Sequence, residues 1–185
     1  MFKQLVMIAA FLLLAVYSLV AQHPEKIYKT LNGNIGFKAV YADTVIVASS
    51  SNLIATLDYE LATIKFKLNF NTFETGSEFF NSFFHSQIPI MMEFEGKLGI
   101  DYIITENHPA LDFEVDGIMT LNNIKKRMLL EGTLVHYPTE GDIACNLKLE
   151  FDLNLKDFDL TEKFSGFHET LQMEVFQAVL KNYTE

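Results

Sequence analysis

The chain has 185 residues, of which 49% are hydrophobic and 21% charged, and its formal net charge is −10. This length suits one domain with at most a processed segment, and the apolar content excludes a disordered acidic tail. The negative charge argues against nucleic acid as a partner, because phosphates would be repelled. A single cysteine excludes an intramolecular disulfide and a cysteine-based zinc cluster.

The first twenty residues have the features of a secretory signal. Lys3 precedes an apolar run over residues 5–20, and Ala21 supplies a small residue at the expected cleavage point. The alternative is an uncleaved membrane anchor, but the run is slightly short for one. No cysteine follows the run, which excludes a lipoprotein linkage. We therefore expect a signal peptide over residues 1–21, a single domain over residues 22–185, a periplasmic or secreted location, and no stable membrane span after cleavage.

Beyond Pro24, hydrophobicity alternates with a period of two. The clearest stretch covers residues 64–70, where apolar and polar side chains alternate without a break, and residues 35–41 and 143–155 behave in the same way. Such alternation is typical of antiparallel strands with one buried and one wet face. The other strands that the pattern predicts lie at residues 44–49, 54–59, 90–98, 111–115, 117–121 and 127–137. Regular short strands without intervening helices predict an all-β, mainly antiparallel barrel or sandwich.

Turn residues separate the predicted strands. Asn32 with Gly33, and Asn122 with Asn123, are residues that adopt left-handed turn conformations, and residues 140–142 break the chain before the long last alternation. Residues 161–167 are the most loop-like segment of the domain.

Two segments depart from the strand pattern. Residues 77–84 predict a short helix with Ser77 as N-cap and Glu78 in the first turn, and pairs of Phe four residues apart form its apolar face. Residues 168–180 fit a strand and a helix equally well, so periodicity leaves their structure open.

The sequence contains no pattern typical of a catalytic or metal site. The five histidines are widely spaced, and we interpret them as surface or loop residues. His85 is the exception, because it follows the Phe-rich helix and could lie at the mouth of a cavity. Neither a serine-nucleophile elbow nor a glycine-rich phosphate loop is present. Cys145 has the period of a buried strand residue, and we expect residues 125–127, a basic cluster, to keep a sheet edge soluble. We predict no enzyme activity, no cofactor and no metal.

Phenylalanine is the unusual component: the chain has 17 Phe and 7 Tyr but no Trp. One interpretation is a core packed with Phe. The other is an apolar cavity inside a barrel, because an eight-stranded barrel can either be filled by side chains or hold one small ligand. The pattern alone leaves both open and favours the filled core.

Several weak motifs in a fixed order resemble the YceI-like family of exported lipid-binding β-barrels. The segments that carry the resemblance are residues 28–37, 54–58, 64–73, 77–84, 88–97 and 117–126. The chain departs from the family at Asn123, which replaces a hairpin glycine, and at Lys125, which stands where Thr is usual. The predicted helix region is also short.

The resemblance implies an extended lipocalin-like barrel of about eight strands with one short helix, binding a polyisoprenoid or another long-chain lipid. It also favours a strand over residues 171–179. With alternation, it leads us to expect the following ligand-lining residues: Phe37, Phe66, Leu68, Phe70, Phe79, Phe83, Phe84, Met91, Phe94, Phe113, Leu121 and Leu147.

Two rival functions stay open at this point. One is a structural or interaction barrel with a packed core and no ligand. The other is an enzyme acting on a lipid, for which His85 and His136 would be the first residues to test. The expected partner is an apolar lipid or isoprenoid, and the sequence leaves open whether the protein is a monomer or a homodimer.

Overall fold

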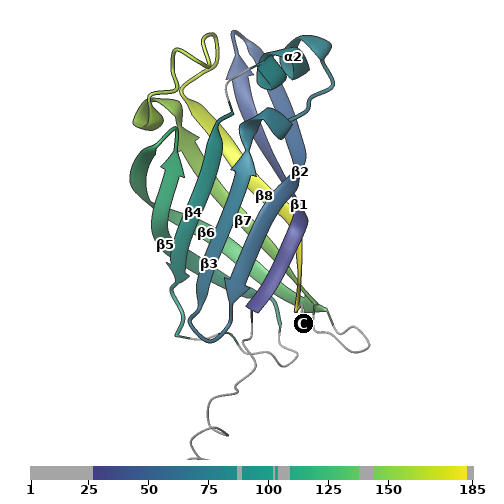
Figure 1. The fold of residues 1–185 in the computed structure, drawn as a ribbon, viewed down its shortest axis with the longest axis vertical. Coiled ribbons are helices and arrows are strands. Elements are labelled where there is room, and N and C mark those ends of the chain that lie inside the picture. The colour runs from purple at the N-terminus through teal and green to yellow at the C-terminus, as the bar shows by residue number, and fades with distance from the viewer. Residues whose placement is uncertain (1–26, 87–88, 102, 104–108, 138–143, 183–185) are drawn as a thin grey trace, which may run out of the picture.

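The computed structural model describes residues 27–86, 89–101, 103, 109–137 and 144–182 (Figure 1). These residues form eight strands, one α-helix and two short 3-10 helices. Their bounds are β1 Ile27–Tyr41, β2 Thr44–Asp58, β3 Thr63–Asn69, η1 Phe70–Thr72, α2 Glu78–Ser86, β4 Met91–Leu98, β5 Leu111–Leu121, β6 Ile124–Tyr137, β7 Ala144–Asn154, η2 Leu155–Phe158 and β8 Thr170–Asn182. Within this part of the chain, no helix is long and apolar enough to span a membrane.

The eight strands close into one barrel. Each strand pairs antiparallel with the next, and β8 pairs antiparallel with β1. The prediction of an all-β, lipocalin-like barrel with one short helix is therefore confirmed. The final strand, β8, resolves the ambiguity over residues 168–180 in favour of the strand that the family resemblance implies.

Some predicted strands have different bounds in the structure. The two strands predicted at residues 111–115 and 117–121 are one continuous strand, β5, because Asp116 and Gly117 both pair with β4 and β6. Strand β6 begins at Ile124, three residues earlier than the pattern indicated. Part of the alternation predicted from residue 143 lies outside the described residues, and β7 is described from Ala144.

The two asparagine-containing turns have opposite outcomes. Asn122 and Asn123 adopt left-handed conformations, with φ of 51° and 65°, and form the tight turn between β5 and β6. A turn at Asn32 and Gly33 is wrong, because β1 runs through both residues with a shift of pairing register. A Cβ at Gly33 would lie 3.3 Å from both Ala178 and Leu53, so this glycine permits close packing inside a strand. Residues 140–142 lie outside the described part.

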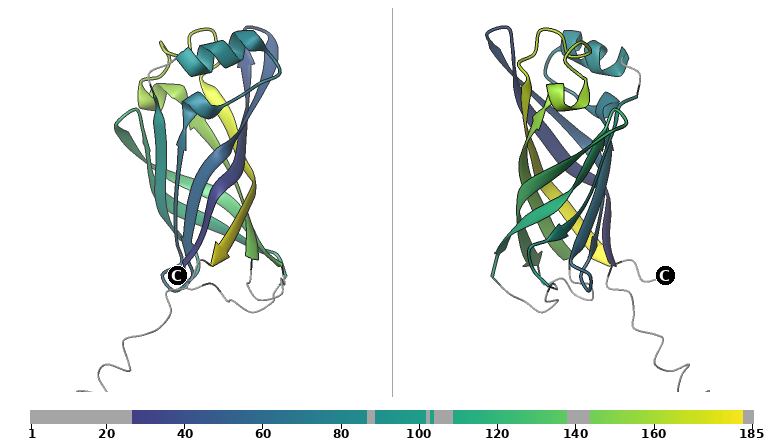
Figure 2. Two further views of the ribbon diagram at one scale, coloured as in Figure 1. Left: turned by 45° about the vertical axis from the view of Figure 1, so that its right-hand side comes forward. Right: turned by 90° about the vertical axis from the view of Figure 1, so that its left-hand side faces the viewer.

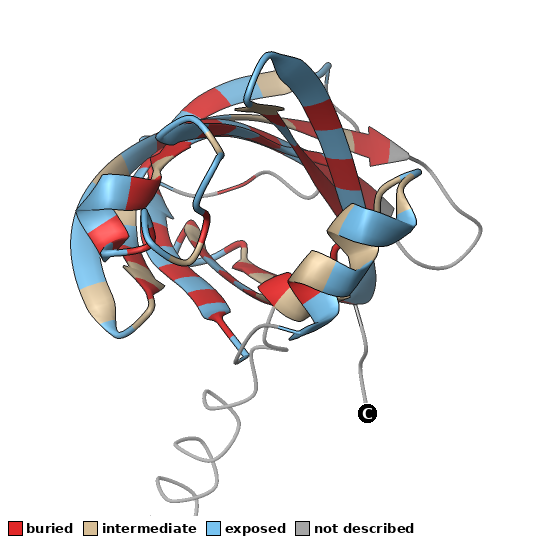
Figure 3. Ribbon diagram, turned by 90° about the horizontal axis from the view of Figure 1, so that it is seen from above, coloured by how far each residue is buried: buried red, intermediate tan, exposed pale blue. Residues whose placement is uncertain are grey.

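Buried and exposed residues alternate along the strands of the barrel wall (Figure 3). In β4, for example, Met92, Phe94 and Leu98 are buried while Glu93 and Glu95 are exposed. This is the period of two that the sequence shows, and burial of one face of every strand supplies the main stabilisation.

Helix α2 and the loop between η2 and β8 lie over one end of the barrel (Figures 1 and 2). We call this the α2 end, and we call the opposite end, where Tyr28, Tyr59, His136 and Cys145 lie, the far end. Helix α2 begins directly after Ser77, as predicted, and the carbonyl of Ser77 accepts a hydrogen bond from the Asn81 amide.

The basic cluster at residues 125–127 does not protect a sheet edge, because the closed barrel of the described strands has none. Its charges pair locally instead. The Arg127 guanidinium donates two hydrogen bonds to the Asp116 carboxylate on β5, which lowers the pKa of Asp116, and the Lys126 ammonium lies 3.7 Å from a carboxylate oxygen of Asp157.

Candidate functional site

The interior of the barrel is the candidate site, and it is apolar along most of its length. The expected ligand-lining residues that are buried are Phe37, Phe66, Leu68, Phe70, Phe84, Phe94, Phe113, Leu121 and Leu147. All of these except Phe70 and Phe84 belong to strands, and they project inward from five strands, β1, β3, β4, β5 and β7. That they contact a ligand stays a prediction.

Met91 does not belong to this interior set. Its side chain is 42% exposed, whereas that of the next residue, Met92, is fully buried. Met91 is three residues from Phe94, and residues an odd number apart in a strand face opposite sides. The expectation for Met91 is therefore wrong, and Met92 takes the interior position.

Aromatic side chains from opposite walls meet in the middle of the interior. The rings of Phe66 on β3 and Phe94 on β4 stack with centroids 5.1 Å apart, and Phe66 also approaches Phe151 on β7, 6.2 Å away. Because β3 and β7 are four strands apart in a ring of eight, the latter contact crosses the lumen. Phe66 is 3% exposed and Leu68 is 1% exposed, so side chains fill the described lumen at this level.

Paired glycines on the inner wall make room for these rings. Gly96 on β4 pairs with Gly117 on β5, and both face inward. A Cβ added to Gly117 would lie 2.5 Å from the Phe94 ring and 2.5 Å from the carbonyl oxygen of Glu95. The Phe94 ring thus lies over a patch of bare backbone, which only glycine provides.

At the α2 end, one ring of the helix enters the barrel. The Phe84 side chain is 1% exposed and contacts Phe37 and Phe73, with centroid separations of 5.7 and 6.4 Å. Phe83 is partly buried, and Phe79 is 63% exposed. Phe84 therefore closes the mouth. Phe79 lies on the outer side of the helix, so the expectation that it lines the ligand site is wrong.

The loop before β8 completes the seal. Phe164 and Phe167 lie 5.8 and 5.7 Å from the Phe83 ring. Gly166, in a left-handed conformation with φ of 93°, packs directly against the ring of Tyr41, where a side chain would collide. The mouth is thus closed by aromatic contacts between α2, this loop and the end of β1.

A buried polar cluster closes the far end. The Tyr59 hydroxyl and Nε2 of His136 are 2.8 Å apart, and the Tyr59 hydroxyl also interacts with the thiol of Cys145. The ring of Tyr28 stacks on that of Tyr59 at 4.2 Å. Tyr59 follows β2 while His136 is on β6, so the hydrogen bond crosses the lumen.

His136 departs from the expectation that the histidines are surface or loop residues, because it is 6% exposed and lies on an inward-facing strand position. His85 and His168 are exposed, whereas His23 and His108 lie outside the described residues. Cys145 is buried as predicted, but the Tyr59 hydroxyl lies beside its thiol. Its surroundings are therefore less apolar than the alternating pattern of β7 indicated.

Burial raises the pKa of the Cys145 thiol from its ordinary value of 9.0 to about 11. The folded protein therefore favours the protonated thiol, and this contribution to stability is complete below pH 9 and is lost as the pH rises to 11. We expect the free energy of unfolding to fall by about 2–3 kcal/mol from this thiol over that interval. In Cys145→Ala, urea denaturation at several pH values should show a smaller fall; an identical alkaline slope in both proteins would contradict the assignment.

The described side chains include no arrangement of three or more His, Cys, Asp or Glu that would hold a metal ion. The polar cluster contributes one imidazole and one thiol, and burial raises the pKa of Tyr59 far above its usual range. Neither a deprotonated nucleophile nor a hydrolytic triad is formed by these groups.

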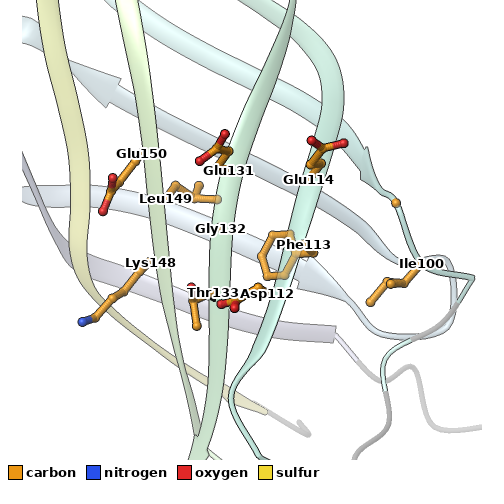
Figure 4. A pocket seen from close by; sticks show the side chains of 11 residues that line it. Ile100, Asp112, Phe113, Glu114, Glu131, Gly132, Thr133, Lys148, Leu149 and Glu150 are labelled. Carbon is orange, nitrogen blue, oxygen red and sulfur yellow. Dashed lines mark hydrogen bonds between the residues drawn. The ribbon is translucent and has the colours of Figure 1, made fainter.

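A shallow hollow on the outer wall carries a row of like charges (Figure 4). Glu114, Glu131, Glu150 and Glu174 are exposed and lie directly opposite one another on β5 to β8. Directly opposed carboxylates repel each other and destabilise the sheet.

Glu150 lies between Glu131 and Glu174, so removing its charge relieves two repulsions. We expect Glu150→Gln to raise the Tm by about 2 °C at low salt, and added salt should shrink the gain. The matched control is Glu162→Gln, in an exposed turn. Equal thermal shifts for the two variants would show that the row has no energetic effect.

Solved structures with the same architecture identify the fold. A polyisoprenoid binding domain from Saccharophagus degradans, implicated in plant cell wall breakdown, superposes with a TM-score of 0.62 at 6% identity, covering 86% of this chain and 99% of that chain. The fold is that of the YceI-like barrels. BcnA from Burkholderia cenocepacia has a TM-score of 0.56 at 10% identity, with 82% and 96% of the two chains covered. The YCEI protein of Campylobacter jejuni has a TM-score of 0.53 at 13% identity, with 74% and 85% covered.

No protein-family model and no curated protein sequence matches the chain. The similarity to YceI-like barrels is therefore one of fold. The YceI-like architecture accounts for the two features that the family resemblance implied, an elongated closed barrel and a short helix beside its mouth.

The sequence did not indicate the cluster at the far end. Tyr59 and His136 are 77 residues apart and belong to no shared motif, so only closure of the barrel brings them together. Phe164 and Phe167 were also not expected at the mouth, although two Phe residues within one loop-like segment were a usable signal. For Met92, the alternation with Phe94 was sufficient to predict that its side chain faces the interior.

Proposed function

We propose that this protein is an exported carrier that binds a long apolar chain, such as a polyisoprenoid or other lipid, inside the barrel. The observation that carries the proposal is the largely apolar interior of the barrel, closed by aromatic rings at the α2 end, in a fold shared with a polyisoprenoid binding domain. Export rests on the signal-like residues 1–21, which lie outside the described part. Binding would gain about 0.8 kcal/mol for each CH₂ group removed from water.

The barrel interior extends along the length of its strands. Strand β7 has 11 residues, and at about 3.3 Å per residue with a tilt of about 40° it rises roughly 28 Å along the barrel axis. Because side chains fill the described lumen, a ligand must displace rings such as Phe66 and Phe151. These rings have neighbours of the same apolar character, so contacts between rings are exchanged for contacts with the chain.

The direct experiment is native mass spectrometry of the protein purified from the cell that makes it. The proposal predicts a bound mass of lipid size that organic extraction removes and that reappears on adding the extract. Protein that carries no such mass, and that does not bind N-phenyl-1-naphthylamine after extraction, would refute it.

One observation favours a second function, an interaction barrel without ligand. The Phe66–Phe151 contact crosses the lumen, as the filled-core interpretation expects. In that case extraction changes neither mass nor thermal stability. A rise in Tm on adding back the extract would instead support the carrier, because a ligand that binds only the folded state stabilises it.

A further inference from the structure

The polar cluster at the far end lies inside the lumen and not on its rim. Tyr59 is 1% exposed and Cys145 is fully buried. Two leucines of the wall lie beside the cluster: Leu57 pairs with Tyr28, and Leu180 pairs with Cys145. A chain lying along the lumen would therefore meet mainly apolar side chains, with the buried Ser50 as an exception, until this end, where a hydroxyl, an imidazole and a thiol face it.

The phenol and the thiol of the cluster are uncharged. Burial keeps the Tyr59 phenol and the Cys145 thiol protonated, because it raises the pKa of both groups. Among the described residues, no lysine, arginine, aspartate or glutamate is buried. A phosphate or carboxylate brought here would lose its water without gaining a permanent cation, which is costly.

The hydrogen-bonding capacity of the cluster suits a group that both donates and accepts. A phenol has one donor and two acceptor lone pairs, and the hydroxyl of Tyr59 shares one interaction with Nε2 of His136, at 2.8 Å, and one with the Cys145 thiol. An alcohol can donate to the remaining lone pair of the phenol oxygen or accept from the thiol. It therefore fits either tautomer of His136.

We propose that Tyr59, His136 and Cys145 form the subsite for the uncharged hydroxyl head of a long-chain alcohol whose chain occupies the lumen. This inference rests on the proposed function, and it adds the orientation of the ligand and the chemistry of its head. The hydroxyl lies at the far end, and the apolar tail extends towards Phe84 and the α2 end.

The test compares chain-matched ligands in two variants. Binding of dodecan-1-ol, dodecane and dodecanoate is measured by displacement of N-phenyl-1-naphthylamine from the full-length protein after extraction. Tyr59→Phe removes one hydroxyl and keeps the ring. The control is Thr72→Val, which removes a hydroxyl bonded to Ser50 at 2.7 Å, near the α2 end.

Tyr59→Phe should weaken dodecan-1-ol about tenfold and leave dodecane within about twofold of its original affinity. Thr72→Val should leave the ratio of the two affinities unchanged, and dodecanoate should bind the original protein more weakly than the alcohol. Unchanged dodecane binding also shows that Tyr59→Phe is folded. An equal effect of Tyr59→Phe on alcohol and alkane, or no effect on either, overturns the subsite while the carrier function stands. If the original protein binds none of the three ligands, the carrier function itself fails, and the subsite fails with it.

Discussion

Replacing Gly117 with alanine is expected to lower the free energy of unfolding by about 3 kcal/mol. The new methyl group would lie 2.5 Å from the Phe94 ring and 2.5 Å from the Glu95 carbonyl oxygen, and the second of these is backbone that cannot rotate away. Overpacking of this kind in a filled core costs about 1–3 kcal/mol, and a collision with backbone belongs at the upper end. Urea denaturation followed by circular dichroism measures the change.

Gly76→Ala is the matched control for this substitution. No atom lies within 4 Å of the Cβ position of Gly76, so its replacement should change stability by less than about 0.5 kcal/mol. The double variant Gly117→Ala with Phe94→Leu should recover part of the loss, because a shorter side chain gives the methyl group room. Equal stabilities for Gly117→Ala and Gly76→Ala would show that Phe94 does not pack on this glycine.

Replacing Phe84 with alanine is expected to cost about 3 kcal/mol and to open the α2 end. Phe84 is the buried residue of α2, and it joins the helix to Phe37 and Phe73 inside the barrel. Truncation of a buried Phe commonly costs 3–5 kcal/mol, and the lower figure applies where the helix can settle into the space. Stability and the amide-exchange rates of α2 report the two effects.

The control lies on the opposite face of the same helix. Phe79 is 63% exposed, so Phe79→Ala should change the free energy of unfolding by less than about 1 kcal/mol. It should also leave the amide-exchange rates of α2 unchanged. If α2 is the entry, Phe84→Ala also binds and releases N-phenyl-1-naphthylamine faster than Phe79→Ala. Identical stability and probe kinetics in the two variants would contradict the assignment of Phe84 as the seal.

Much of the fold was predictable because strands and turns of an antiparallel barrel depend on local sequence patterns. Alternation at residues 64–70 predicts which side chains of β3 are buried, and Asn122 with Asn123 predicts the β5–β6 turn. The turn predicted at Asn32 and Gly33 failed because a glycine has two uses. It permits turns, but it also permits close packing, and at Gly33 the neighbour is Ala178, which is 145 positions later in the chain.

The candidate site was predictable only in part, for a related reason. Alternation placed Phe66, Phe94 and Leu147 inside the barrel. It carries no information on which rings meet across the lumen, because that depends on closure between strands far apart in the sequence. The Phe66–Phe151 contact and the Tyr59–His136 hydrogen bond are both of this kind, and they show that the lumen is filled in its middle and polar at its far end.

The absence of tryptophan from the chain permits a direct test of where a ligand lies. In one variant, Phe151→Trp, the indole would face the lumen; in the other, Phe176→Trp, it would lie on the outer wall, where Phe176 is 40% exposed. Each is titrated with a long-chain alcohol brominated along its chain, which quenches indole fluorescence only on contact. A chain bound in the lumen predicts saturable quenching in Phe151→Trp and little in Phe176→Trp. Equal quenching in the two variants, or none in Phe151→Trp at concentrations that displace N-phenyl-1-naphthylamine, would contradict binding inside the barrel.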